Sequence, residues 1–254
     1  MRTNQVKQQL REGKTTLGSW LTLPDVIATH YMARVGFDWL TVDMEHSPTS
    51  LETATLMFQA IAQAGCVPLA RVPWNTPENV KRVLDSGAFG VIFPMQNTRA
   101  EVEQAVEATL YPPQGFRSVG ASLPALAFDT DAGTYFQRAN EEILIVIQIE
   151  HIQAVERADE LLSVPGVDAV FIGPSDLSAS MRLQPGASAG DPRFQEAVEH
   201  VRATAARLGV APGIHVFSVE DARARLAQGF RFVALNSDAR FMSGAARSTL
   251  AQLR

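Results

Sequence analysis

A repeated pattern, in which a glycine precedes a short apolar run, limits most strongly how this chain of 254 residues can fold. Segments such as "ARVGFDWLTVDM" and "SVPGVDAVFIGP" pass from helix-like residues through a glycine into an apolar run. A glycine at a helix end can take the left-handed conformation and turn the chain into the next strand. The glycines of the six repeats are Gly36, Gly65, Gly87, Gly166, Gly209 and Gly229. The pattern therefore predicts strands that alternate with helices.

Two further apolar runs, "TLGSWLTL" near the start and "LIVIQIE" in the middle, raise the number of predicted strands to eight. Apolar strands that alternate with helices indicate a parallel sheet covered on its outer face. Eight such units in 254 residues favour a (β/α)₈ TIM barrel, with one domain spanning residues 1–254. An open doubly wound sheet is a weaker prediction, because no G-x-G-x-x-G motif follows the first strand.

Charge and composition exclude several classes of partner. The net charge of −5 and the absence of a Lys/Arg run argue against nucleic-acid binding. Cys66 is the only cysteine, which rules out an internal disulfide. No apolar run approaches the roughly 20 residues of a membrane span, and the polar N-terminus does not resemble a signal peptide. We therefore expect a cytoplasmic protein without membrane or nucleic-acid partners.

Two carboxylates are predicted at the carboxyl end of the barrel. Side chains alternate along a strand, so Gln148 and Glu150 should face inward where the run 144–150 ends. The next strand brings Asp176 to the same rim, and neighbouring strands lie about 5 Å apart. Carboxylates this close repel unless one is protonated or a cation lies between them, and oxygen ligands suit Mg²⁺ or Mn²⁺. The alternative is a pair of ordinary solvated loop acids.

Other predicted strand ends add functional side chains to this rim. Asp43, Glu45 and His46 follow the second strand, Arg71 ends the third, and Trp20 lies near the end of the first. Any one of them alone would more often be structural than catalytic. Because active sites of TIM barrels lie at this face, their convergence favours a catalytic site.

The three lysines restrict the chemistry available to such a site. None of Lys7, Lys14 and Lys81 lies in a predicted strand, which excludes a Schiff-base lysine at the barrel mouth. Carbanion chemistry would therefore need a metal as its electrophile. No glycine-rich loop follows the last two strands, so a phosphorylated substrate is disfavoured.

Six motifs, spread over nearly the whole chain, resemble a known family. They are "VDMEHSP" at 42–48, "ARVPWN" at 70–75, "LDSGAFGVIFPM" at 84–95, "YPPQGFRSVG" at 111–120, "IQIE" at 147–150 and "FIGPSDLS" at 171–178. Together they resemble the HpcH/HpaI class II pyruvate aldolases, typified by 4-hydroxy-2-oxoheptanedioate aldolase and 2-dehydro-3-deoxyglucarate aldolase. The resemblance implies a metal-dependent carbon–carbon lyase.

The resemblance also implies roles for residues at the predicted rim. Glu150 and Asp176 would be the ligands of a divalent metal, Mg²⁺, Mn²⁺ or Co²⁺. His46, oriented by Asp43, would be the general base. Arg71 would bind the keto oxygen and stabilise the enolate.

Further positions would bind the substrate or support catalysis. Gln148 resembles a residue that contacts pyruvate, and backbone amides around Ser175 and Asp176 resemble the site that binds its carboxylate. Trp20 is placed with these substrate-binding residues because it lies at the same rim. Asp85 lies where an acid that supports catalysis is expected.

The implied reaction is reversible retro-aldol cleavage of a 4-hydroxy-2-oxo acid to pyruvate and an aldehyde. Succinic semialdehyde, tartronate semialdehyde and lactaldehyde are candidates for that aldehyde. Members of the family are similar in forming homohexamers in which the C-terminal helix is exchanged between paired subunits. Two alternatives remain open: an acyl-CoA lyase of the malyl- or citramalyl-CoA type, and a non-catalytic barrel that binds a keto acid.

One predicted connection is unusually long. A helix over residues 98–110 should run back to the N-terminal face of the barrel, where the connection 111–143 would begin. This connection carries Arg117 and the apolar run 122–128, and loops of such length are usually functional or interfacial. It either caps its own barrel or packs on a neighbouring subunit and helps to close that subunit's pocket. The role of His215 also stays undecided.

Overall fold

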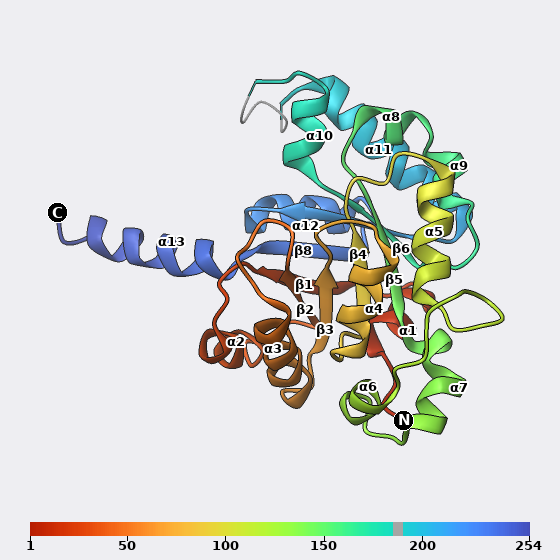
Figure 1. Cartoon of the computed structure of the whole chain (residues 1–254). Coiled ribbons are helices and arrows are strands. Elements are labelled where there is room, and N and C mark those ends of the chain that lie inside the picture. The colour runs from red at the N-terminus through yellow and green to blue at the C-terminus, as the bar shows by residue number, and fades with distance from the viewer. Residues whose placement is uncertain (185–189) are drawn as a thin grey trace.

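The computed structural model describes residues 1–184 and 190–254, and it shows a closed parallel barrel of eight strands (Figure 1). Each strand pairs with the next in the sequence, and the last pairs with the first. The strands are β1 (Thr16–Leu21), β2 (Trp39–Asp43), β3 (Val67–Arg71), β4 (Gly90–Phe93), β5 (Leu144–Ile149), β6 (Ala169–Ile172), β7 (Ala211–Val216) and β8 (Phe232–Ser237). The predicted (β/α)₈ barrel is therefore confirmed.

Helices cover the outside of the barrel between successive strands (Figure 1). They are α2 (Val26–Met32), α3 (Leu51–Gln63), α4 (Pro77–Asp85), α5 (Arg99–Thr109), α8 (Ile152–Glu156), α9 (Ala158–Leu162), α10 (Pro174–Ser180), α11 (Pro192–Leu208) and α12 (Val219–Ala227). Local signals set their first residues. Thr98, for example, forms a capping box with Glu101 at the start of α5, which satisfies two amides that the helix leaves free.

The six glycines that precede strands all have positive φ angles, as the repeat pattern predicts. Gly209, with φ of 75°, caps α11 in the left-handed conformation and leads directly into β7. A different glycine, Gly18 on β1, is required by packing, because a Cβ there would lie 2.0 Å from the Trp39 ring. That ring stacks on Phe232 with 4.1 Å between ring centres and fills the barrel interior. The barrel is thus a packed core rather than a channel.

Residues 111–143 contain two helices, α6 (Ser122–Ala127) and α7 (Ala132–Glu142), where the sequence predicted an irregular connection. Phe128 between them stacks on Phe89, which directly precedes β4, with 3.7 Å between ring centres. The segment therefore covers the N-terminal end of its own barrel. Helix α6 escaped the prediction because no side chain caps its start and Pro124 interrupts its apolar run.

The two ends of the chain differ in their relation to the barrel (Figure 1). Helix α1 (Gln5–Arg11) packs beneath it, where buried Lys7 forms an ion pair of 2.9 Å with Asp168. Helix α13 (Asp238–Ala251) instead projects away from the barrel and leaves Met242 and Leu250 exposed. In the described residues no helix combines the length and apolar character needed to cross a membrane.

Candidate active site

The carboxyl ends of the strands surround a cavity of about 250 Å³. Its lining is Trp20, Thr22, Asp43, His46, Arg71, Gln148, Phe171, Gly173, Pro174, Ser175, Asp176, His215, Phe217, Ser237 and Arg240. Seven of the residues that the sequence assigned to a site are among them, and Glu150 lies beside them through its contact with Gln148. The cavity is therefore the candidate active site.

Arg71 is held rigidly at the end of β3. Its Nε donates to Asp43 Oδ1 over 2.9 Å, and its Nη2 donates to Asp43 Oδ2 over 2.7 Å. Glu45 Oε2 lies 3.2 Å from Nη1, and the guanidinium lies 4.4 Å from the centre of the Trp20 ring. Burial lowers the pKa of Arg71, but the hydrogen bonds and charge of Asp43, with the charge of Glu45, more than offset this and raise it. A permanently charged, preoriented cation faces the cavity.

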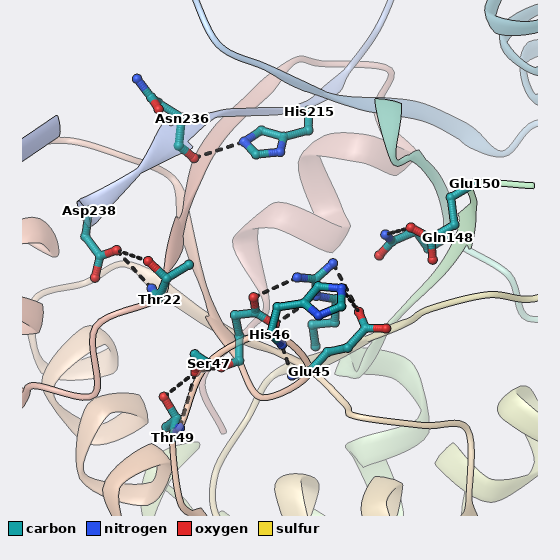
Figure 2. Close-up of polar contacts among 12 residues, drawn as sticks. Thr22, Glu45, His46, Ser47, Thr49, Gln148, Glu150, His215, Asn236 and Asp238 are labelled. Atoms are coloured by element: carbon teal, nitrogen blue, oxygen red, sulfur yellow. Dashed lines mark hydrogen bonds and ion pairs between the residues drawn. The ribbon is translucent and has the colours of Figure 1, made fainter. Parts of the chain in front are cut away.

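The structure corrects the predicted link between Asp43 and His46. The Asp43 carboxylate is paired with Arg71, and its Oδ1 accepts from the backbone amides of Glu45 and His46. It therefore positions the turn after β2 rather than the imidazole. The ring lies near a different acid, with Nε2 3.7 Å from Glu45 Oε2, and 63% of the side chain is exposed (Figure 2). His46 is thus free to reach a ligand in the cavity.

Glu150 follows the last residue of β5 and is buried, with only 3% of its surface exposed. Its Oε1 accepts from the Met95 backbone amide over 2.8 Å, and its Oε2 accepts a short hydrogen bond from Gln148 Nε2 (Figure 2). Burial raises the pKa of Glu150 to about 7, and the charges of Asp176 and Glu45 act in the same direction. Neighbouring negative charges thus oppose ionisation of Glu150 in addition to its burial.

This arrangement suits a hard cation. The charges of Glu45, Glu150 and Asp176 influence one another, and burial raises the pKa of Glu45 as well. The buried Gln148 Oε1 accepts no hydrogen bond within the described residues. A bound cation would favour the ionised carboxylates and remove the repulsion. Gly173 leaves the necessary room, because a Cβ there would lie 2.5 Å from Glu150 Oε2. The described chain contains no cluster of three or more His, Cys, Asp or Glu side chains with metal-ligand geometry. A cation bound between Glu150 and Asp176 would therefore need further oxygen atoms from substrate or water.

Two further predicted residues lie at different ends of the barrel. Ser175 lies in the first turn of α10 beside Asp176 and lines the cavity. Asp85 ends α4, which runs back toward the N-terminal face, and it pairs there with buried Arg117 over 2.8 Å. Within one chain, Asp85 therefore cannot support catalysis at the strand ends, contrary to the prediction.

The last two strands contribute residues that the sequence prediction missed or left undecided. His215 on β7 is 3.1 Å from the Asn236 backbone oxygen through Nε2, and burial lowers the pKa of its imidazole to about 4 (Figure 2). The ring is therefore neutral at physiological pH. Asp238 accepts from Thr22 through both the backbone amide and the hydroxyl, which ties β8 to β1. The rule that strand ends line the site would have identified these residues as well.

Comparisons with known proteins show which family the chain resembles. The family model "HpcH/HpaI aldolase/citrate lyase" matches residues 16–245. A hydroxypyruvate/pyruvate aldolase of Rhizorhabdus wittichii is 37% identical over 99% of both chains. A 5-keto-4-deoxy-D-glucarate aldolase of Shigella dysenteriae is 39% identical over 92% of this chain and 91% of the relative.

A solved structure of the same family has a closely similar fold. The crystal structure of an HpcH/HpaI aldolase/citrate lyase family protein from Burkholderia cenocepacia superposes with a TM-score of 0.91 at 34% identity. The superposition covers 99% of this chain and 100% of that one. The sequence match and the shared barrel both extend over almost the entire length. The chain therefore belongs to the HpcH/HpaI aldolase/citrate lyase family.

Proposed function

We propose that this protein catalyses the metal-dependent, reversible retro-aldol cleavage of a 4-hydroxy-2-oxo acid to pyruvate and an aldehyde. One observation carries the proposal: the same rim of the barrel holds a buried acid whose pKa is raised, Glu150, and a fixed cation, Arg71. The aldolases among its relatives support the reaction class. They also favour it over an acyl-CoA lyase or a non-catalytic barrel. We further propose a cytoplasmic enzyme with one barrel domain over residues 1–254.

Glu150 and Asp176 would hold the divalent metal, Mg²⁺, Mn²⁺ or Co²⁺. The substrate would bind such a cation through its carboxylate and keto oxygens, and the cation would supply Lewis-acid stabilisation of the developing enolate. Gln148 and the backbone amides near Ser175 would orient the pyruvate half. Trp20 would form an apolar wall beside Arg71, because the guanidinium already lies over its ring.

The protein's own groups would then stabilise charge and move the proton. Breaking the C3–C4 bond leaves a pyruvate enolate, and the Arg71 guanidinium would neutralise its oxygen in a partly dry site. His46, which lines the cavity, would take the proton from the C4 hydroxyl, directly or through a water molecule, and return a proton to C3 of the enolate to give pyruvate. An imidazole suits this task because its ordinary pKa lies near neutrality.

Pyruvate alone provides the test, since no aldehyde has to be known. We expect the enzyme to exchange the methyl protons of pyruvate in D₂O, as followed by NMR. The exchange should stop with EDTA and return with Mg²⁺, Mn²⁺ or Co²⁺. Borohydride in the presence of pyruvate should leave no covalent adduct by mass spectrometry, because no lysine is among the described residues that line the cavity. Exchange that persists after complete metal removal, or a borohydride adduct, would contradict the mechanism.

The exposed outer face of α6 suggests that a neighbouring subunit completes the site. A cavity of about 570 Å³ between α3 and α6 is lined by Leu56, Leu123 and Leu126, of which Leu126 is 74% exposed. Burying apolar surface against a neighbouring subunit would stabilise the association by about 25 cal/mol per Å². We propose a homohexamer with exchanged C-terminal helices, in which residues 111–143 help to close a neighbour's pocket. Asp85 would then act only in that neighbour's site.

Mixed oligomers test this arrangement. Arg71→Ala damages a subunit's own chemistry, whereas Leu126→Asp damages only the surface offered to a neighbour. Two inactive variants reassembled together should recover part of the wild-type activity, up to roughly a quarter for random pairing of two defects. Native mass spectrometry would confirm mixing, and each variant reassembled with itself is the control. A fully active monomer, or confirmed mixed oligomers without recovered activity, would exclude the arrangement.

A further inference from the structure

The candidate active site has two chemically different ends. Gln148 and Glu150 lie at one end, whereas Thr22 and Asp238 lie across the view at the other, where β1, β8 and the start of α13 meet (Figure 2). The first end holds the proposed pyruvate and metal positions. The second end is therefore left for the part of the substrate that departs as the aldehyde.

Arg240 is the cationic side chain that lines the cavity at this second end. It belongs to the first turn of α13 and lines the cavity, and its guanidinium lies 4.7 Å from the centre of the Phe217 ring. This contact orients the group without neutralising it. Of the two arginines in the lining, Arg71 pairs with Asp43, whereas Arg240 forms no ion pair with any described residue.

The groups around Arg240 do not compensate its charge. Asp238, two residues earlier, accepts from the amides of Thr22 and Leu23 and from the Thr22 hydroxyl. His215 is neutral at physiological pH, since burial lowers the pKa of its imidazole to about 4. A guanidinium that lines a cavity without an ion-pair partner can bind an anion, above all a carboxylate, which it can bind through two parallel hydrogen bonds.

We propose that Arg240 determines aldehyde specificity by binding a terminal carboxylate, so that the preferred substrates are aldehydes bearing an acid group. The inference rests on the proposed aldolase function, because it assigns the end of the same cavity that pyruvate leaves free. The preferred 4-hydroxy-2-oxo acids are accordingly dicarboxylates. Their C1 carboxylate binds at the metal end, and their distal carboxylate binds at α13.

Two aldehydes of equal length test the proposal. The probes are 4-oxobutanoate, which is charged, and 4-oxobutanamide, which is neutral, each condensed with pyruvate at saturating Mn²⁺. We expect the wild-type kcat/KM to favour the acid over the amide by roughly tenfold, as for a charge-assisted hydrogen bond. In Arg240→Gln this ratio should fall to near one through loss of the acid reaction. Arg240→Lys should keep part of the preference for the acid, because lysine keeps the positive charge but cannot form the two parallel hydrogen bonds of a guanidinium.

Arg223→Gln is the matched control, since it removes the same charge from the exposed face of α12, away from the cavity lining, and should leave the ratio unchanged. Equal wild-type efficiency with both aldehydes would overturn the inference, as would an unchanged ratio in Arg240→Gln. Should Arg240→Gln fail to fold, the wild-type ratio and Arg240→Lys still decide the matter. Pyruvate proton exchange by the wild-type enzyme separates a failure of the aldolase function from a failure of the role given to Arg240. If exchange occurs without a preference for the acid, only the role of Arg240 is wrong. If no exchange occurs, the aldolase function is wrong as well.

Discussion

Glu150→Gln should abolish metal-dependent turnover and yet stabilise the metal-free protein. Glutamine has nearly the same volume but cannot supply a carboxylate ligand. Loss of a residue that only orients a metal ligand lowers metal affinity or activity by up to roughly 100-fold, so loss of the ligand itself should lower them further. Titration with Mn²⁺ in a calorimeter would show the lost binding, and steady-state kinetics would show the lost activity. Activity equal to that of the wild type would refute the ligand assignment.

The stabilisation should depend on pH with a definite sign. Burial raises the pKa of Glu150 from 4.5 to about 7 in the folded, metal-free protein. Between these values the unfolded chain releases its proton while the folded chain retains it, so stability falls as the pH rises. Above pH 7 the full cost is present, and the two pKa values imply roughly 3 kcal/mol. Glutamine removes this cost.

Thermal melting of the two metal-free proteins would measure the effect. We expect Glu150→Gln to melt roughly 6 to 12 °C higher than the wild type above pH 7, and the difference to vanish near pH 4. Glu156→Gln is the control, because Glu156 is exposed near the end of α8 and should show neither effect. A melting difference that grows toward low pH would contradict the assigned cause.

Arg71→Ala should lower kcat by roughly 100- to 1,000-fold, with a smaller change in KM. The developing enolate carries more negative charge than the ground-state ketone, so losing the cation removes stabilisation mainly from the transition state. Steady-state kinetics of the cleavage reaction would separate the two parameters. A change confined to KM would show that Arg71 serves only to bind the substrate.

The alanine variant also leaves the buried Asp43 carboxylate without its partner, which can cost roughly 3 to 5 kcal/mol of stability. Arg71→Lys is therefore the companion variant. A lysine can keep the carboxylate paired, but it cannot form both hydrogen bonds of the guanidinium fork. We expect it to stay folded and still to lose most of the wild-type kcat, which would separate catalysis from folding.

Local sequence signals predicted the barrel because its repeating unit is local. Gly36, Gly65 and their counterparts mark the step from helix to strand, and their positive φ angles are a property of single residues. Residues 111–143 were harder to predict, because α6 lacks a capping side chain. Distant contacts hold this segment, among them the stacking of Phe128 on Phe89, and no local pattern reports them.

The rim residues were predictable for a related reason. Alternation along β5 places Gln148 and the following Glu150 on the inner side, and a parallel barrel brings all carboxyl strand ends to one face. Asp85 was assigned to this rim by resemblance alone. It lies at the opposite face because the helix that carries it runs antiparallel to the strands.

By itself, then, the sequence determined the barrel, its active face and the types of side chain found there, because these follow from short-range periodicity and the order of the elements. Only the tertiary structure decided which of these side chains pair. Asp43 pairs with Arg71 rather than with the His46 ring, Glu150 is buried deeply enough to raise its pKa, and Arg240 forms no ion pair with a described residue. Such pairings depend on ångström distances and on burial between residues far apart in the chain. Those quantities arise only when the strands close into a barrel.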